Sequence, residues 1–596
     1  MSDSRVRDGL SAYAWVGVCL WLVAMPFEAT QPLFRLPGQS ISSAEAALFF
    51  VFAACGLALI AQLASGGWRA AALFLDTPLS LPWAAFLLAV TVSALAATAE
   101  RTNAVHMAAR FALAFAAFLV AASGATSPRR LEGVFLVAVL TGAIVSALAA
   151  LEFIGVPPVL RWLTAFRPGV FVVGAQVRAA GPFQYPTIAS MYLEVLFAFA
   201  LALLLVLLDR GRLALASFAA LSLVLISEAI VLTFTRSGLI TMGLTLAVVG
   251  VWRLRMGRAE ALRAGNGEGR HHGRDRGVWA IVAVAAVIGI ELWSSHSADA
   301  VRLRLTTEDQ DQWYHVTVDA PSALGLATGA TTTVPVSLTN TGLATWDSSA
   351  APPFRLAYHW LLPDADRSID FEGVRTDFPE RVAPGQTIAM QARVRAPRQP
   401  GRYRLMWDVV EEGRLWFSSE RDAELVITEA TVTGAATGAL GEGRSVLLPK
   451  GPARPGRFTL WAAAGRMWLD HPLLGVGPDN FRLLYGPYAR ISNPDPRVHS
   501  NNMDVEVLVD AGLAGLIAFA WFGCRLLELL MRLVRNAVHG ETAMIAAGVT
   551  AGTVAIGVHG FVDSFFSFTA TYVLFAVTLG LVVGADRLVS AHVHRI

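Results

Sequence analysis

The chain has 596 residues, of which 55% are hydrophobic and only 15% are charged, and its formal net charge is +2. Soluble domains carry about 25% charged residues, so this composition predicts a polytopic membrane protein, and the small net charge gives no support for nucleic-acid binding. Cys19, Cys55 and Cys524 all lie in apolar stretches, which argues against a disulfide framework or a cysteine-based metal site.

A helix needs about 20 apolar residues to cross the hydrocarbon core of a bilayer. Stretches of this kind occur near residues 12–27, 44–64, 78–97, 104–123, 131–153, 187–208, 212–233, 237–252, 278–293, 505–531, 542–560 and 567–586. They predict a mainly α fold with about 12 transmembrane helices. The first of these is expected to be retained, because no convincing signal-peptide cleavage site follows it.

Basic residues gather in alternate connections between these stretches. The connections are SPRR (127–130), DRGR (209–212), the segment 252–277 and RLVRNAVHGE (532–541). By the positive-inside rule they are cytoplasmic, together with both termini. Residues 154–186 and 294–504 are therefore expected on the exported side of the membrane, which corresponds to the periplasmic side of a bacterial inner membrane.

A different pattern occupies the larger of these two periplasmic segments. From about residue 313 to 428, short runs of alternating apolar and polar residues, such as TIAMQARVRAP and GRYRLMWDVVEEG, are separated by turn residues. They predict an antiparallel, all-β sandwich that resembles Ig-like domains. The predicted organisation is helices 1–9 (1–293), a linker (294–312), the sandwich (313–428), a periplasmic loop (429–504), and helices 10–12 with a cytoplasmic tail (505–596).

The periplasmic loop contains a second predicted element. Phe458, Trp461, Trp468 and Leu469 lie close to helical spacing, so they predict an amphipathic helix along the membrane surface. The segment HPLLGVGPDNF (471–481), rich in proline and glycine, ends this helix.

Five segments occur in an order that is typical of one family. They are VRAAGPFQYPTIASMYL (177–193), LTFTRSGLI (232–240), HPLLGVGPDNF (471–481), VEVLVDAGLAGL (505–516) and HGFVDSFFSF (559–568). Together with a polar His-Asn loop before residue 505, they resemble the motifs of the O-antigen ligase and polysaccharide polymerase superfamily. The resemblance covers the membrane portion from about residue 170 to 590, and the β-sandwich is an addition to it.

The resemblance implies a metal-independent glycosyltransferase without a cofactor. Members of this family transfer a glycan from undecaprenyl diphosphate to a hydroxyl of lipid A core or of a growing chain, at the periplasmic face. Arginine suits the diphosphate, because its planar fork donates to phosphate oxygens and keeps its charge. Arg178 and Arg236 match the family's arginine motifs and are the predicted diphosphate ligands. The simpler alternative for each is an arginine that reaches the lipid headgroups.

The acceptor hydroxyl must also lose a proton, and His499 is the predicted base. The family's histidine falls at the position of Asn501, two residues later, so two alternatives stay open. Either His499 reaches the same point, or another group such as Asp504 or His471 is the base. Asn501, Asn502 and Asp504 are candidates for binding sugar hydroxyls.

Several other polar residues have expected roles. Four more arginines lie near the predicted site, and at most one or two of them are expected to contact phosphate; they are Arg466, Arg482, Arg490 and Arg497. Asp510 is expected to cap or pair locally, and His559 to hydrogen-bond between helices.

Three alternatives remain at the level of function. A ligase and a polymerase share these motifs and differ in the acceptor. A transporter or flippase for the same lipid-linked glycan would also use about twelve helices, although no internal repeat typical of transporters is evident. In the third, the sandwich, whose own partner the sequence does not indicate, is the working part and the helices anchor it.

Overall fold

The computed structural model divides the chain into two compact units. The residues that it describes are 2–36, 39–64, 76–167, 169–173, 176–264, 272–294, 313–350, 352–363, 368–370, 372–412, 415–419, 426–439, 455–491, 494–539, 542–564 and 566–593. The helical unit comprises Met1–Phe171, Val177–Leu305 and Arg454–Ile596, and the β unit comprises Val172–Gln176 and Thr306–Ala453. The predicted linker 294–312 lies outside the described residues except for Ser294.

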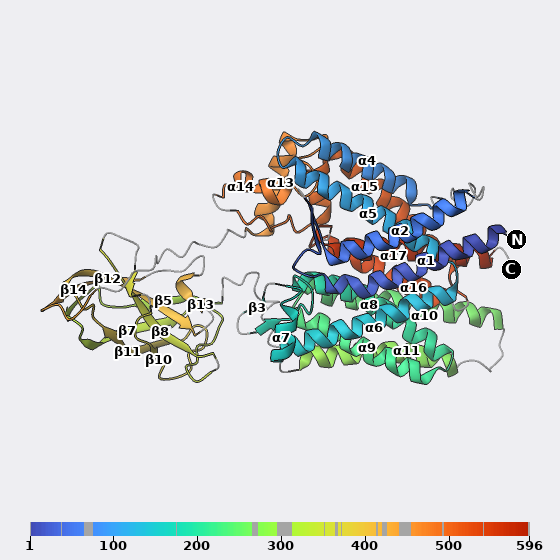
Figure 1. The fold of residues 1–596 in the computed structure, drawn as a ribbon. Coiled ribbons are helices and arrows are strands. Elements are labelled where there is room, and N and C mark those ends of the chain that lie inside the picture. Colours follow the sequence, from blue (N-terminus) through green and yellow to red (C-terminus); the bar gives the residue numbers. More distant parts are fainter. Residues whose placement is uncertain are drawn as a thin grey trace. The chain divides into compact units, whose positions relative to one another are not determined.

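The helical unit has a helix at each of the twelve predicted positions (Figure 1). These helices are α1 (Ser2–Ala24), α2 (Ser43–Ala64), α4 (Ser80–Ala96), α5 (Arg101–Gly124), α6 (Pro128–Phe153), α8 (Pro186–Asp209), α9 (Leu213–Leu232), α10 (Arg236–Ala264), α11 (His272–Trp293), α15 (Met503–Asn536), α16 (Thr542–Gly560) and α17 (Thr569–Val593). Within the described residues, 11 of them are long and apolar enough to cross a membrane, and α4 is shorter. The prediction of a mainly α, polytopic membrane protein is confirmed.

The centre of the helical unit is α8. Its sequence is apolar on all sides, and nearly all of its side chains are buried because α6, α9, α10 and α16 surround it. In contrast, most of the side chains of α11 are exposed, as expected of a helix at the lipid-facing periphery.

The two ends of the helical unit differ. Both termini lie at one end (Figure 1), where Arg210 pairs with Glu132 and Arg253 pairs with Asp209. The opposite end carries α13 (Arg457–Asp470), α14 (Phe481–Ala489) and the short helix α7 (Pro157–Leu163). Two small hairpins were not predicted, β1–β2 (Phe34–Leu36, Gln39–Ile41) and β3–β4 (Phe171–Val173, Gln176–Arg178).

Helix α15 is interrupted at Gly512, which has φ 64° and ψ −165°. A break inside a membrane helix leaves backbone groups without helical partners, and these must be satisfied elsewhere. The segment 472–477 satisfies four of them. The amides of Val476 and Gly477 donate to the carbonyls of Val509 and Asp510, and those of Leu513 and Ala514 donate to Pro472 and Leu473, at 2.9 to 3.1 Å. The glycine-rich segment 471–481 and the break in α15 therefore form one unit.

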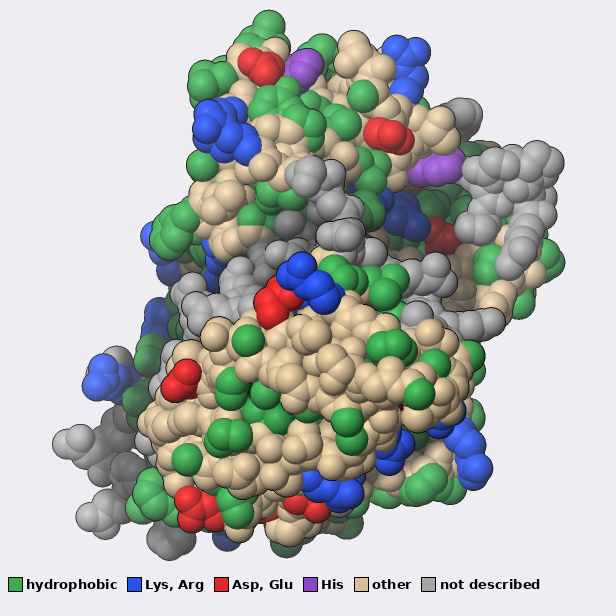
Figure 2. Space-filling model, turned by 90° about the vertical axis from the view of Figure 1, so that its left-hand side faces the viewer, with side chains coloured by type: hydrophobic (Ala, Val, Ile, Leu, Met, Phe, Trp, Pro, Cys, Tyr) green, Lys and Arg blue, Asp and Glu red, His purple; other side chains and the backbone are tan. Residues whose placement is uncertain are grey.

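Helix α13 is amphipathic. Leu460, Ala464 and Met467 are buried against α14 and α15, whereas Phe458 is 83% and Leu469 is 69% exposed. Figure 2 shows hydrophobic side chains at the surface among charged ones on the end of the helical unit that carries α13 and α14. An exposed apolar face beside charged groups is typical of a helix at a membrane interface.

The β unit consists of two sheets. The larger contains β10 (Thr376–Asp377), β8 (Phe354–Leu361), β12 (Gly401–Glu411), β14 (Ile427–Thr433) and β6 (Ala323–Ala327) in that order, with β9 (Ser368–Asp370) and β13 (Leu415–Trp416) at its margins. The smaller has the order β11 (Thr387–Arg395), β7 (Thr331–Asn340) and β5 (Val316–Asp319). Burial alternates along β11, and Trp360 donates to the carbonyl of Arg395 at 2.8 Å, so the sheets face each other as a sandwich.

Two details of the β unit differ from the prediction. The sandwich is not wholly antiparallel, because β14 pairs with β6 in parallel. These strands are far apart in the sequence, so no tight hairpin forces them to run in opposite directions. Strand β14 also continues to Thr433, beyond the predicted limit at residue 428.

Candidate active site

His499 lies in the loop that precedes α15 and is held by a carboxylate. Its Nδ1 contacts Glu506 Oε1 at 2.5 Å, and the other oxygen of Glu506 accepts from the amide and hydroxyl of Ser500 at 3.0 and 2.7 Å. Asn502 caps α15, since its side chain accepts from the amide of Val505 at 2.9 Å, and this places Glu506 in the first turn. The imidazole is thus fixed with Nδ1 toward Glu506.

The surroundings of His499 change its protonation. Burial is the largest single influence and lowers the pKa of this imidazole, but the charge and hydrogen bond of Glu506, together with the charge of Asp479, outweigh it, so the pKa is raised overall. Arg482 also acts to lower it. Because Nδ1 faces a carboxylate, Nε2 is the nitrogen that remains for a second partner.

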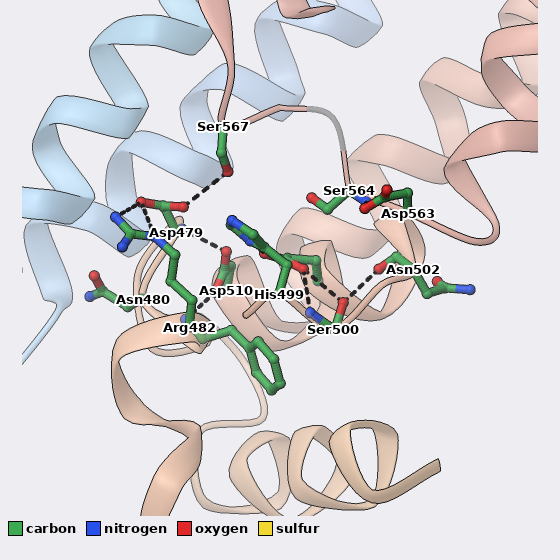
Figure 3. Close-up of polar contacts among 12 residues, drawn as sticks. Asp479, Asn480, Arg482, His499, Ser500, Asn502, Asp510, Asp563, Ser564 and Ser567 are labelled. Carbon is green, nitrogen blue, oxygen red and sulfur yellow. Dashed lines mark hydrogen bonds and ion pairs between the residues drawn. The ribbon is translucent and has the colours of Figure 1, made fainter. Parts of the chain in front are cut away.

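A second polar group surrounds Asp479, beside His499 (Figure 3). Asp479 Oδ2 accepts from Arg482 Nε and Nη2 at 2.9 and 2.6 Å, and from Asn103 of α5 at 3.2 Å. Its Oδ1 accepts from Ser567 at 3.1 Å. Burial raises the pKa of Asp479, but the bonds from Arg482 outweigh this, and the pKa is lowered overall.

Asp510 fixes the backbone of this group. Its two oxygens accept from the amides of Asp479 and Phe481 at 2.6 and 3.0 Å. Both amides lie about 30 residues earlier in the chain, so the expectation that Asp510 caps or pairs locally is wrong. Asp479 itself has φ 67° and Asn501 has φ 54°, in the left-handed region that residues other than glycine seldom adopt.

A small cavity of about 20 Å³ adjoins these groups. One part of its wall is polar, with Asp479, Glu506, Asp510, Ser564 and Ser567. The remainder is largely apolar and shares Phe86, Phe111 and Phe566 with an aromatic cavity, also of about 20 Å³, between α4, α5, α15 and α17. The lining is thus polar at one end and apolar at the other, and each space holds about one water molecule.

The segment that carries Arg178 is anchored to α6. Glu152, near the end of α6, pairs with the buried Arg167 at 2.5 Å. Its other oxygen accepts from the amides of Ala180 and Gly181 at 3.0 and 2.8 Å. This carboxylate therefore fixes the backbone directly after Arg178.

The structure brings Arg178 to the turn that begins with Thr233 and ends at Arg236. Arg178 Nε donates to the carbonyl of Thr233 at 3.0 Å, and Arg236 is the first residue of α10, three residues later. Phe234 in this turn has φ 51°, which is rare for a bulky side chain. The two predicted diphosphate ligands therefore lie at the same connection between α9 and α10.

His559 lies between the α9–α10 connection and the region of His499. Its Nε2 lies 3.2 Å from Ser237 Oγ, and its Nδ1 lies 3.0 Å from both oxygens of Glu194. This is the interhelical role expected from the sequence. Burial raises the pKa of Asp563, whereas His559 and His499 both act to lower it, so this carboxyl lies within electrostatic range of both imidazoles.

The other predicted residues have the following places. Asn502 donates to the carbonyl of Phe561 at 3.0 Å in addition to capping α15, and Asp504 is half-buried in the first turn of α15. Arg466 donates to the carbonyl of Tyr488, and Arg497 forms a two-bond pair with Asp495. Arg490 ends α14 with φ 58°.

Residues 435–520 match the family model described as O-antigen ligase. The chain contains an O-antigen ligase domain. The match includes α13, α14, the loop with His499, and the first half of α15 up to and beyond Gly512. Arg178, Arg236 and His559 lie outside the matched residues of the ligase domain, and it is the fold that places them near it. No curated protein matches the chain.

Three residues of the ligase domain were not predicted as site residues: Asp479, Glu506 and Asp510. Each lies within one of the segments that resemble the superfamily. A carboxylate near the start of a helix usually stabilises the helix end, so these residues did not stand out as candidates for the site. In the part of the chain that the structure describes, no group of three or more His, Cys, Asp or Glu side chains is arranged to hold a metal ion.

Proposed function

We propose that this protein is a membrane glycosyltransferase that transfers a glycan from undecaprenyl diphosphate to an acceptor sugar hydroxyl. The acceptor is a lipid A core sugar, as for an O-antigen ligase, and the alternative is the end of a growing chain, as for a polymerase. The family match supports an enzyme of this general type. The donor and acceptor are those that the resemblance to the superfamily implies, and the chemistry of the site is compatible with them.

The observation that carries the proposal is the convergence of distant residues. Arg178 bonds to the turn that leads to Arg236, Ser237 beside Arg236 contacts His559, and His559 and His499 act on one carboxyl, that of Asp563. Side chains so far apart in sequence rarely meet unless they share a site.

The arginines have the chemistry that the donor requires. As the bond between the glycan C1 and the diphosphate oxygen breaks, negative charge grows on the leaving undecaprenyl diphosphate. Arg178 and Arg236 stabilise this charge in the proposal, because guanidinium groups donate two bonds each and do not lose their proton.

The His499–Glu506 pair has the chemistry that the acceptor requires. Nε2 of His499 takes the proton of the acceptor hydroxyl as its oxygen forms the new bond to C1. The imidazolium that results is stabilised by Glu506 on Nδ1. Asn501, Asn502 and Asp504, with the polar wall of the neighbouring cavity, are proposed to bind sugar hydroxyls. The transfer is proposed to be metal-independent.

The proposal also includes an orientation. The end of the helical unit with both termini also carries the basic connections, which the positive-inside rule assigns to the cytoplasm. The site is then periplasmic, where lipid-linked glycans are assembled into polymers, and α13 lies in the outer headgroup layer. The β unit is proposed to be a periplasmic Ig-like module.

Reconstitution tests the proposal. Purified protein in nanodiscs is incubated with an undecaprenyl-diphosphate-linked glycan and an acceptor, and new glycosidic bonds are detected by mass spectrometry. A transporter would yield no new bond. In cells, loss of a ligase leaves long glycan on the carrier and bare core, whereas loss of a polymerase leaves core capped with a single repeat.

A further inference from the structure

Three buried side chains from three helices form a hydrogen-bonded chain behind Arg236. Glu194 of α8 contacts both His559 of α16, at 3.0 Å, and Ser190 of its own helix, at 2.7 Å. The other ring nitrogen of His559 contacts Ser237 of α10 at 3.2 Å. Glu194, His559 and Ser237 are 2%, 1% and 6% exposed.

The directions of these bonds follow from the groups involved. A carboxylate only accepts, so His559 Nδ1 carries the proton and donates to Glu194. When the imidazole is neutral, Nε2 accepts from the hydroxyl of Ser237, and when it is protonated, Nε2 donates to that hydroxyl. Glu194 therefore determines, through His559, how the Ser237 hydroxyl is oriented.

Gly238 leaves space for these hydrogen-bonded side chains. A Cβ atom at this position would lie 2.5 Å from Ser190 Oγ and 3.3 Å from Glu194 Oε1. Only a glycine lets the first turn of α10 approach α8 so closely. The adjacent residues Arg236, Ser237 and Gly238 thus each have a distinct place at the start of α10.

Buried ionisable groups at membrane depth are costly and seldom serve packing alone. Ser237 directly follows Arg236, and the turn before it contains Phe234 with its left-handed φ of 51°. We propose that Glu194, His559 and Ser237 form a positioning chain that fixes the first turn of α10, and thereby the Arg236 guanidinium, for binding the diphosphate of the donor. This inference rests on the proposed function, and none of the three residues is assigned contact with substrate.

Binding of undecaprenyl diphosphate to the purified protein in nanodiscs tests the inference without requiring turnover. Ser237→Ala removes the last bond of the chain and is expected to weaken binding about tenfold, the effect of one well-placed hydrogen bond. Glu194→Leu is expected to weaken it at least as much. Glu194→Gln keeps an acceptor oxygen for His559, so its loss is expected to be smaller than that of Glu194→Leu.

Thr553→Val is the matched control for buried polarity in α16. Thr553 is buried, and in the part of the chain that the structure describes its hydroxyl donates only to the carbonyl of Val549 in its own helix, at 2.7 Å. This variant is expected to bind undecaprenyl diphosphate as the unsubstituted protein does. Kinetic measurements should show a higher KM for the donor in Ser237→Ala and an unchanged KM for the acceptor.

The outcomes separate the inference from the proposed function. If Ser237→Ala folds and binds the carrier as tightly as the unsubstituted protein, the positioning role is wrong, and this holds even if Glu194→Leu fails to fold. If Arg236→Ala also leaves binding intact, the diphosphate site itself is wrong. Weak binding in both Arg236→Ala and Ser237→Ala, with normal binding in Thr553→Val, supports both.

Discussion

At the scale of single residues, the ion pair between His499 and Glu506 determines when the proposed base is active. A base must be neutral to take a proton, and the pKa of His499 is raised above its ordinary value by Glu506. The rate is therefore expected to fall as the pH is lowered through this raised pKa. The charges of Glu506, Asp479 and Arg482 all change the pKa of the imidazole. His499 in turn acts to lower the pKa of Asp563.

Glu506→Gln tests this pairing. Without the carboxylate charge the pKa of His499 is lowered, so the acid limb of the pH–rate profile is expected to move to lower pH. The maximum rate is expected to fall by about tenfold or more, because a charge-assisted hydrogen bond is lost. A profile of transfer rate against pH measures both effects, and an acid limb that stays in place would show that His499 is not the titrating group.

His499→Ala removes the proposed base altogether. General-base catalysis contributes about 10²–10⁴-fold, so the transfer rate is expected to fall by that factor while the carrier still binds. Undiminished transfer over the pH range would favour the alternatives that stay open from the sequence, Asp504 or His471. Asp504→Asn and His471→Ala then identify which of them is the base.

Arg236 offers a sharper test of charge against geometry. Arg236→Ala is expected to lower kcat by about 10²–10³-fold, the usual cost of removing one group that stabilises transition-state charge. Arg236→Lys keeps the charge but loses the planar fork, so a smaller loss is expected. The elution profile of each purified variant in detergent checks that it is inserted and folded. Full activity in both Arg236→Ala and Arg236→Lys would contradict the phosphate role.

At the scale of elements, the break in α15 depends on a glycine. A Cβ at Gly512 would lie 2.4 Å from the backbone carbon and oxygen of Leu473, and the backbone there has a positive φ. Gly512→Ala is therefore expected to displace segment 472–477 and destabilise the protein by roughly 1–3 kcal/mol. Because Asp510 and Asp479 belong to the same unit, activity is expected to fall as well.

Gly523→Ala is the control for this prediction. Gly523 lies in the same helix, and a Cβ there meets nothing within 4 Å. The melting temperature of this variant is expected to equal or slightly exceed that of the unsubstituted protein, since alanine favours a helix. Equal melting temperatures for the two variants would show that the contact with segment 472–477 does not hold α15 in its broken form.

The same break shows what could be predicted from the sequence. Long apolar runs gave the positions of the helices, because the length of a membrane span is fixed by the bilayer. The run from 505 to 531 predicts a single helix, and a glycine inside such a run is tolerated, so Gly512 by itself does not show that the helix is broken there. The break is stable only because a segment about 35 residues earlier supplies partners for its backbone, and such long-range pairing leaves no local pattern.

Some residues of the candidate site could also be predicted from the sequence, and others could not. Arg178, Arg236 and His499 were predicted because they lie in or beside the segments that resemble the motifs of the superfamily. Glu506 was not predicted, because its contact with His499 forms only when the loop folds back and brings the two side chains together. The small hairpins also escaped prediction, as strands of three residues are too short to show an alternating pattern.

At the scale of the whole molecule, every residue assigned to the proposed chemistry lies in the helical unit. Removal of residues 313–439, replaced by a flexible glycine-serine linker, is therefore expected to leave the helical unit folded and able to transfer glycan. The cut must extend past residue 428, because β14 runs to Thr433 and a shorter deletion would leave exposed strand residues that pair with β12 and β6 in the intact unit. Transfer to a small soluble acceptor is measured beside binding of undecaprenyl diphosphate. If binding persists and transfer to this acceptor disappears, the β unit contributes to the reaction itself; if only transfer to a large, lipid-anchored acceptor is lost, the β unit serves to recruit that acceptor.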